Sequence, residues 1–172
     1  MAAVIAAPAS GSGKTLLSLA LLSWAHQNGR RIQPFKVGPD YLDAQLLSQA
    51  SGQACRNLDL NLCGEDWVRR AFHGYGGVAD LTLVEGVMGL FDGIGSSETG
   101  STADVARLLG LPVVLVLDAG GQAASLGALV RGFRDHDPNL AIAGVVLNKV
   151  SSPRHRELLS EVLDRMQVPL LG

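Results

Sequence analysis

Hydrophobic residues along this chain gather in short apolar runs, and longer segments with helical character separate each run from the next. The runs are the expected strands: residues 2–7, 31–37, 81–84, 112–117, 140–147 and the start of one more at 168–171. The expected helices are residues 13–28, a short helix ending near 50, and 65–75, 102–109, 122–134 and 153–166. Apolar strands that alternate with helices are typical of a parallel sheet covered on both faces. We therefore predict an α/β fold of three layers, with a doubly wound, mostly parallel sheet in the middle.

Three stretches depart from this alternation. Residues 51–63 show no clear period, so we expect them to be irregular. Pro34 has no N–H group to donate, which predicts an edge or irregular position for the second strand. Residues 86–100 are rich in glycine and are predicted to form a long loop.

Composition and charge narrow the class of protein. The chain has 172 residues, enough for one domain with a substantial core, and its 47% hydrophobic content excludes a disordered chain. A net charge of −2 gives no general electrostatic reason to bind nucleic acid or anionic lipid. No apolar run reaches the roughly 18 residues of a membrane span, and no basic region of a signal peptide precedes the first strand. We expect a cytoplasmic protein without nucleic-acid or membrane partners.

The cysteines and histidines suggest no chemistry of their own. Cys55 and Cys63 fit neither a disulfide framework nor a metal site, so free thiols in a reducing compartment are expected. The histidines have neither metal nor triad spacing: His26, His73, His136 and His155.

The strongest motif follows the first strand. The loop Pro8-Ala9-Ser10-Gly11-Ser12-Gly13 leads through Lys14-Thr15 into the first helix. Small residues allow the backbone N–H groups to surround a polyphosphate, while Lys14 reaches the β- and γ-phosphates and the Thr15 hydroxyl binds Mg²⁺. The usual pattern has glycine in place of Pro8, and an ordinary Gly/Ser turn is the alternative. The order of strand, loop and helix favours a P-loop.

Further polar side chains follow other predicted strands: Lys36, Asp40, Glu85, Asp118, Asn148 and Lys149. In an open parallel sheet, ligands gather outside the carboxyl ends of the strands. Asp40 and Glu85 should therefore converge near Thr15, and a hydroxyl, one or two carboxylates and the phosphates satisfy Mg²⁺. Asp40 could instead be a turn or capping residue, and Lys36 a solvated charge. Glu85 needs a partner because it follows a buried strand.

Three motifs in the same order point to one family. They are residues 7–15, Phe35-Lys36-Val37-Gly38-Pro39-Asp40-Tyr41-Leu42-Asp43 and Glu85-Gly86-Val87-Met88-Gly89-Leu90-Phe91-Asp92-Gly93. Together they closely resemble the cobyrinic acid a,c-diamide synthases, which are grouped with dethiobiotin synthetase and the synthetase domain of CTP synthase. The resemblance spans essentially the whole chain. It implies a P-loop NTPase fold and ATP-dependent amidation of the a and c carboxylates of a corrinoid precursor.

The resemblance also implies a mechanism, in which ATP phosphorylates a substrate carboxylate and ammonia then attacks the acyl phosphate. The implied catalytic residues are Lys14, Asp40, Glu85 and Asp92, and the implied Mg²⁺ ligands are Thr15, Asp40 and Glu85. Asp92 resembles a family catalytic acid that could position or deprotonate the incoming ammonium, although Asp92-Gly93 alone would indicate only a turn.

The resemblance assigns binding roles as well. Lys36 would orient the substrate carboxylate beside the γ-phosphate. Tyr41 and Leu42 fall where the family contacts the macrocycle. Asn148 and Lys149 match the segment beside the adenine, with the Asn148 amide reading the base. The roles of Asp118 and Ser125 stay open.

Members of this family usually carry a C-terminal glutaminase domain that releases ammonia from glutamine. Cys55 and Cys63 lie in the synthetase half, where the family has no glutaminase role. We expect residues 1–172 to be one synthetase domain, the N-terminal part of a longer protein, that cannot hydrolyse glutamine but can use free ammonia. A homodimer is left open.

Other readings remain for this sequence. ParA/MinD-like switch ATPases carry a signature lysine where this chain has Ala9, and they lack the motifs that contain Lys36 and Glu85. A dethiobiotin-type ligase and a nickel-tetrapyrrole a,c-diamide synthase are alternatives within the enzymes. The motifs do not separate cobyrinic from hydrogenobyrinic acid.

Overall fold

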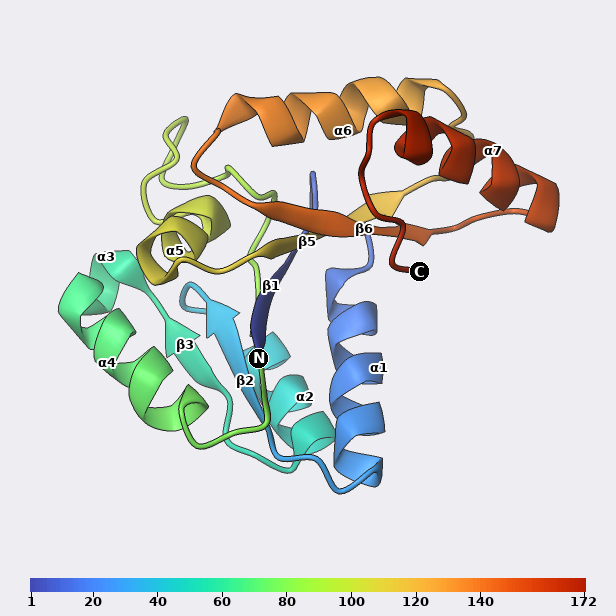
Figure 1. The fold of residues 1–172 in the computed structure, drawn as a ribbon. Helices are drawn as coiled ribbons and strands as arrows, with labels where there is room; N and C mark the ends of the chain where they lie inside the picture. Colours follow the sequence, from blue (N-terminus) through green and yellow to red (C-terminus); the bar gives the residue numbers. More distant parts are fainter.

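The apolar runs form one central parallel sheet in the computed structural model, which describes residues 1–172. Its strands are β1 (Ala2–Ala6), β2 (Ile32–Val37), β3 (Arg56–Leu58), β4 (Leu81–Glu85), β5 (Val113–Asp118) and β6 (Ile142–Asn148). They lie in the order β3-β2-β4-β1-β5-β6, and every pair is parallel (Figure 1). Because the chain starts in the middle of the sheet and builds outward in both directions, the predicted doubly wound fold is confirmed.

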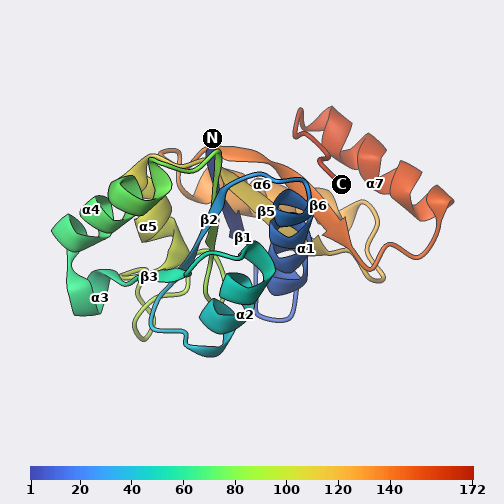
Figure 2. The ribbon, with the colours of Figure 1, turned by 90° about the horizontal axis from the view of Figure 1, so that it is seen from below.

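Helices cover both faces of the sheet. They are α1 (Lys14–Gln27), α2 (Leu42–Ser51), α3 (Leu60–Cys63), α4 (Glu65–Gly76), α5 (Thr102–Leu109), α6 (Ser125–His136) and α7 (Pro153–Arg165). Figure 2 shows α1 and α2 on one side of the sheet and α4 to α7 on the other. Serine side chains cap two of the helices, since the Ser101 and Ser152 hydroxyls accept backbone N–H bonds at the starts of α5 and α7. None of the helices is both long and apolar enough to cross a bilayer.

The two faces have cores of very different size. The cluster beneath α4 to α7 contains 25 buried residues, whereas the cluster beneath α1 and α2 contains eight. Phe35, Val84 and Leu115 belong to the larger cluster, whereas Ile5, Leu83 and Val116 belong to the smaller one. The α1 face therefore has the smaller core.

The prediction for residues 51–63 was wrong, since this segment contains β3 and α3. The strand has three residues and only Leu58 is fully buried, so it is too short to show a period. Asp59 then starts α3, where its carboxylate accepts hydrogen bonds from the backbone N–H groups of Asn61 and Leu62.

The edge position predicted from Pro34 was also wrong, because β2 lies between β3 and β4. Pro34 pairs with Leu83 of β4, but β3 begins to pair only at Phe35. On the β3 side Pro34 therefore lies beyond the end of the ladder, where its missing N–H group costs no strand bond. The strand expected at 168–171 is reduced to a parallel bridge between Leu170 and Val145.

Arg107 joins three parts of the structure at the α5 end of the molecule. Its guanidinium bonds Asp104 of α5 at 2.6 Å, Glu98 of the preceding loop at 3.4 Å, and Asp137 at the end of α6. The hydrogen bond from Arg107 holds the pKa of Asp137 below its usual value. A carboxyl group with a lowered pKa in the folded state stabilises the fold above its unfolded pKa, and the contribution is lost as the pH falls.

We therefore expect Asp137→Asn to lower the free energy of unfolding at pH 7 by about 1–2 kcal/mol. The deficit relative to the unchanged chain should hold down to about pH 4 and narrow only below it, because the lowered pKa keeps the folded wild-type carboxylate charged until then. Urea unfolding followed by circular dichroism at several pH values measures this. Asp135→Asn is the matched control, since Asp135 is exposed and pairs only with Arg134. An equal loss in both variants would contradict the prediction.

Candidate functional site

The loop between β1 and α1 has the backbone that a P-loop needs. Gly11 and Gly13 have φ values of 80° and 108°, in the left-handed region that favours glycine. A Cβ atom on Gly13 would lie 2.5 Å from Nδ2 of Asn148 at the end of β6, and this amide donates to the Ser12 carbonyl at 3.0 Å. Asn148 thus packs against the P-loop from the end of β6, two strands away from β1 in the sheet.

Lys14 lies almost buried at the start of α1, with 7% of its surface exposed. Its Nζ donates to the Met88 carbonyl at 2.6 Å and reaches the Ala9 carbonyl at 3.4 Å. Burial lowers the pKa of Lys14, and the charge of Lys36 lowers it further. The ammonium therefore lies between the P-loop and the loop after β4, among carbonyl groups and close to a second cation.

Glu85 at the end of β4 is the centre of the charged groups. It is fully buried, and its Oε1 accepts hydrogen bonds from the Thr15 hydroxyl at 3.0 Å and from Lys36 Nζ at 2.8 Å. The contact with Lys36 follows from strand register, since Lys36 and Glu85 are paired residues of adjacent strands. The other carboxylate oxygen, Oε2, has no hydrogen-bond partner. A buried oxygen without a partner is costly, so this atom is suited to a further ligand.

Lys36 is also held by the turn that follows β2. Its Nζ lies 2.6 Å from Asp43 Oδ2 and 3.6 Å from Asp40 Oδ2, and the Asp43 N–H donates to Asp40 Oδ1. Burial opposes the charge on Lys36, but Glu85 and Asp43 outweigh it and raise the pKa of Lys36. Burial likewise opposes the charge on Asp43, and the Lys36 hydrogen bond outweighs it and lowers the pKa of Asp43.

Asp43 is the site residue that the sequence analysis missed. It stands in the motif with Lys36 and Asp40, but it is the second residue of α2, where an acid is expected simply for the helix dipole. Only the fold shows that it forms a closer ion pair with Lys36 than Asp40 does.

The predicted magnesium ligands lie around one point but form no dense acidic cluster. Thr15 and Glu85 are in contact, and Asp40 is reached through Lys36. No group of three or more His, Cys, Asp or Glu side chains is arranged to hold a metal ion. The Thr15 hydroxyl and the free Glu85 oxygen fit Mg²⁺, which needs few protein ligands when phosphates supply the rest.

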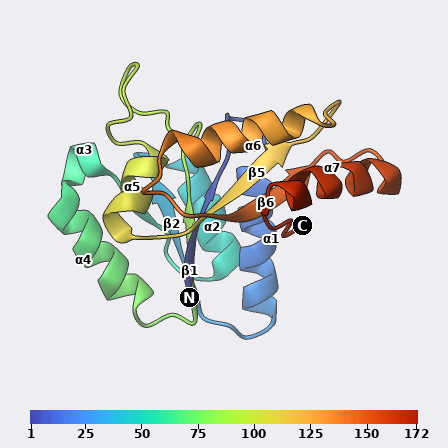
Figure 3. The same cartoon turned by 45° about the horizontal axis from the view of Figure 1, so that its top comes forward.

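Asp92 lies in the loop after β4, next to the P-loop. Its Oδ2 accepts from the Gly89 N–H at 2.8 Å, and the Leu90 N–H donates to the Ala7 carbonyl at 2.8 Å. A Cβ on Gly89 would lie 2.5 Å from the Pro8 carbonyl oxygen, so only glycine permits this approach. The two loops are thereby fastened together, with Asp92 on the same side as Lys14. Figure 3 shows the loop between β4 and α5 extending beyond the sheet.

Exposed apolar side chains surround this end of the sheet: Tyr41, Leu42, Leu62, Met88 and Ile94. Tyr41 and Leu42 are 72% and 71% exposed. Leu62, Met88 and Ile94 line a cavity of about 310 Å³ together with Gly38 and Gly93. The charged groups are thus bordered by a solvent-facing apolar surface of the kind that a large ring-shaped ligand can cover.

Two more of the predicted residues lie at the ends of β5 and β6. Lys149 has a φ of 57° and its Nζ lies 2.5 Å from Asp118 Oδ2. The hydrogen bond from Lys149 lowers the pKa of Asp118. This pair stands beside Asn148 and the P-loop, apart from the Glu85 group.

Cys55 lies outside both groups. Burial raises the pKa of its thiol to about 12, so the thiol is protonated at neutral pH.

Solved structures with a similar backbone are P-loop proteins. Chloroplast FtsY from Physcomitrella patens matches with a TM-score of 0.66 at 17% identity, covering 99% of this chain and 57% of that one. The hydrogenase maturation factor HypB from Archaeoglobus fulgidus matches with a TM-score of 0.56 at 17% identity, covering 96% of this chain and 73% of that one. At such identities the likeness shows the fold alone.

Relatives found by sequence are much more similar to this chain than the solved structures are. The cobyrinate a,c-diamide synthase of Gloeobacter violaceus is 49% identical over 173 residues, which are all of this chain and 38% of the relative. The hydrogenobyrinate a,c-diamide synthase of Streptomyces coelicolor is 52% identical, covering 98% of this chain and 35% of the relative. The chain thus spans little more than a third of the length of these relatives.

The family model that matches is described as the CobQ/CobB/MinD/ParA nucleotide binding domain, and it covers residues 3–172. The resemblance and the P-loop fold predicted from the three motifs are both confirmed. The chain belongs to the CobQ/CobB/MinD/ParA family of nucleotide-binding domains, and within it is similar to the a,c-diamide synthases.

Proposed function

We propose that this chain is the ATP-dependent synthetase domain of a cobyrinate or hydrogenobyrinate a,c-diamide synthase. The observation that carries the proposal is the buried group of Thr15, Lys36 and Glu85 beside the P-loop lysine. Nucleotide binding alone needs Lys14 and the loop. Lys36, a second buried cation, is not needed for that. Its ammonium donates to Asp43, Glu85 and the Gly86 carbonyl, and a substrate carboxylate would replace one of these partners.

The reaction is a phosphoryl transfer followed by an acyl transfer. A carboxylate oxygen of the corrinoid attacks the γ-phosphorus, ADP leaves, and ammonia then displaces phosphate from the acyl phosphate to give the amide. Positioning and charge neutralisation are what such a transfer chiefly requires. Lys14 and Lys36 place positive charge on both sides of the reacting groups. Mg²⁺ bound by Thr15 and Glu85, with Asp40 nearby, would neutralise phosphate charge.

The apolar surface supports a large substrate. Tyr41 and Leu42 are exposed and lie in the chain between Asp40 and Asp43, the two acids beside Lys36, while Leu62 and Ile94 line the cavity. A corrin ring seated there would bring its peripheral carboxylates to Lys36. A ParA/MinD-like switch remains the rival, and Ala9, in place of the signature lysine of those ATPases, argues against it.

The nitrogen source that the chain can use tests its assignment as a synthetase domain without a glutaminase. We expect the 172-residue chain, incubated with ATP, Mg²⁺ and cobyrinic acid, to form the diamide with added ammonium but not with glutamine. Mass spectrometry follows the replacement of OH by NH₂ at each amidation. Product from glutamine without ammonium would contradict the assignment of the glutaminase to another part of the protein. The same assay with hydrogenobyrinic acid and with a nickel tetrapyrrole compares the candidate substrates. ATP turnover without amidation of any of them would favour the switch ATPase.

Glu85→Gln tests the buried carboxylate. The change keeps the volume but removes the charge beside Thr15, so turnover should fall by about 100-fold or more. The fold should survive because Asp43 still pairs with Lys36. Amidation rates and circular dichroism measure the two effects. Glu157→Gln, on the exposed surface of α7, is the control. Near-normal turnover in Glu85→Gln would remove this residue from the site.

Asp92→Asn tests the loop after β4. Asparagine can still accept the Gly89 N–H, so the turn should keep its shape, while a group that accepts a proton from ammonium is lost. We expect amidation to fall by about tenfold or more with ATP affinity changed less than about threefold. A fluorescent ATP analogue measures the affinity. Loss of nucleotide binding would show that Asp92 has a different role.

A further inference from the structure

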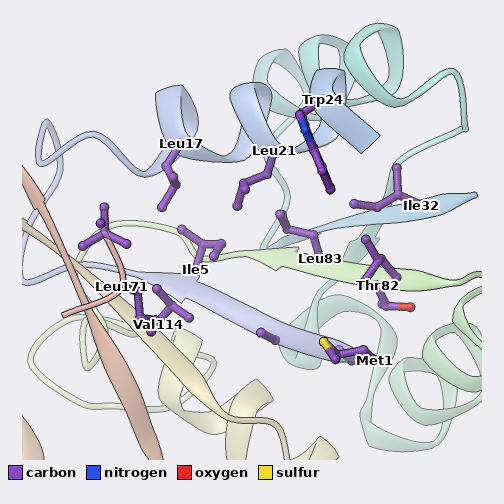
Figure 4. Close-up of a pocket in the computed structure, with 15 residues that line it drawn as sticks. Met1, Ile5, Leu17, Leu21, Trp24, Ile32, Thr82, Leu83, Val114 and Leu171 are labelled. Carbon is purple, nitrogen blue, oxygen red and sulfur yellow. The ribbon is translucent and has the colours of Figure 1, made fainter. Parts of the chain in front are cut away.

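An apolar groove of about 380 Å³ lies on the α1 face of the sheet, and none of the charged side chains of the site lines it. Leu17, Leu21 and Trp24 of α1 form one wall, and strand residues such as Ile5 and Val114 form the floor (Figure 4). Of its 15 lining residues, 13 are hydrophobic, so water gains few hydrogen bonds there. Leu21 is 39% exposed and Trp24 is 57% exposed, although both face other apolar groups across the groove.

The topology explains why residues 1–172 leave this surface bare. Right-handed crossovers place helices on opposite faces when the direction of winding reverses. The steps from β1 to β2 and from β2 to β3 run towards one edge and put α1 and α2 on this face. All later steps run towards the β6 edge and put α4 to α7 on the other face. The α1 face over β5 and β6 therefore receives no crossover helix.

The segment after α7 leads into the groove. The Leu171 N–H donates to the Val145 carbonyl at 2.8 Å, and the Leu147 N–H donates to the Gly172 carbonyl at 2.9 Å. This segment thus runs along β6, and Leu171 and Gly172 line the groove. A Cβ on Gly144 would lie 2.7 Å from Leu171 Cγ and from the Pro169 carbonyl oxygen, so β6 is shaped to seat the segment.

We propose that the groove is the docking site for the polypeptide that follows Gly172 in the full-length protein. The relatives extend well beyond the matched region, since this chain covers 38% and 35% of two of them. A chain that leaves the β6 edge and turns back across the sheet passes directly over the groove. An amphipathic helix laid beside α1 would bury Leu21 and Trp24 and complete the third layer. The inference is independent of the amidation reaction.

Photo-crosslinking in the full-length protein tests the occupant. A benzophenone amino acid replaces Trp24, and in a matched variant it replaces Leu158 of α7, which is also partly exposed. After irradiation of the protein at a concentration where light scattering shows a monomer, peptides are identified by mass spectrometry. We expect position 24, but not position 158, to crosslink to a peptide that lies after residue 172 of the same molecule.

Other results at position 24 overturn the proposal. A crosslink that appears only in a covalent dimer would make a second copy of the chain the occupant. A crosslink confined to residues 1–172, or none at all, would mean that the groove stays open.

A pair of substitutions gives a second, independent readout. Leu21→Glu and Leu158→Glu introduce the same charge at helical leucines that are 39% and 37% exposed in residues 1–172. In the full-length protein, Leu21→Glu should lower the thermal midpoint by about 5 °C or more, because the following segment buries the charge. Leu158→Glu should lower it by about 2 °C or less. Equal shifts in the two variants would overturn the proposal.

Discussion

A buried carboxylate at the end of the central strand pair organises this end of the molecule. Moving an ion such as Glu85 out of water costs several kcal/mol, and only well-placed partners repay it. Lys36 on the next strand and Thr15 at the start of α1 both bond the same oxygen of Glu85. Because each partner belongs to a different element, the ion pair fixes β2, β4 and the P-loop helix relative to one another. Its second oxygen is buried and left without a hydrogen-bond partner.

Glycine packing holds the neighbouring loops to this centre. Gly13 accommodates the Asn148 side chain from β6, and Gly89 accommodates the P-loop backbone at Pro8. Both approaches are closer than any Cβ atom would allow. The P-loop is thus fixed from two sides, by β6 and by the loop after β4. Such a fixed arrangement would suit the phosphoryl transfer proposed above, which depends on placing charges rather than on forming bonds to the protein.

The two faces of the central sheet differ, since one carries the larger core and the other carries the apolar groove. Charged chemistry is concentrated at the carboxyl ends of the strands, whereas the groove beside α1 is apolar and lies under Leu21 and Trp24. The separation follows from the winding of the sheet, which places α1 and α2 on one face and α4 to α7 on the other. The charged groups and the apolar groove therefore occupy different parts of the domain.

The sequence by itself determined the parallel sheet, most of its helices and the P-loop, because apolar strands and glycine-rich turns are properties of contiguous residues. It also placed Lys36 and Glu85 at strand ends, so their meeting could be anticipated from the rule for open sheets. It did not reveal β3, whose three residues are too few for a pattern, nor the interior position of Pro34. Only the tertiary structure decided that Asp43 forms the closer pair with Lys36, since the geometry of the turn after β2 brings Asp43 to 2.6 Å from the ammonium and leaves Asp40 at 3.6 Å.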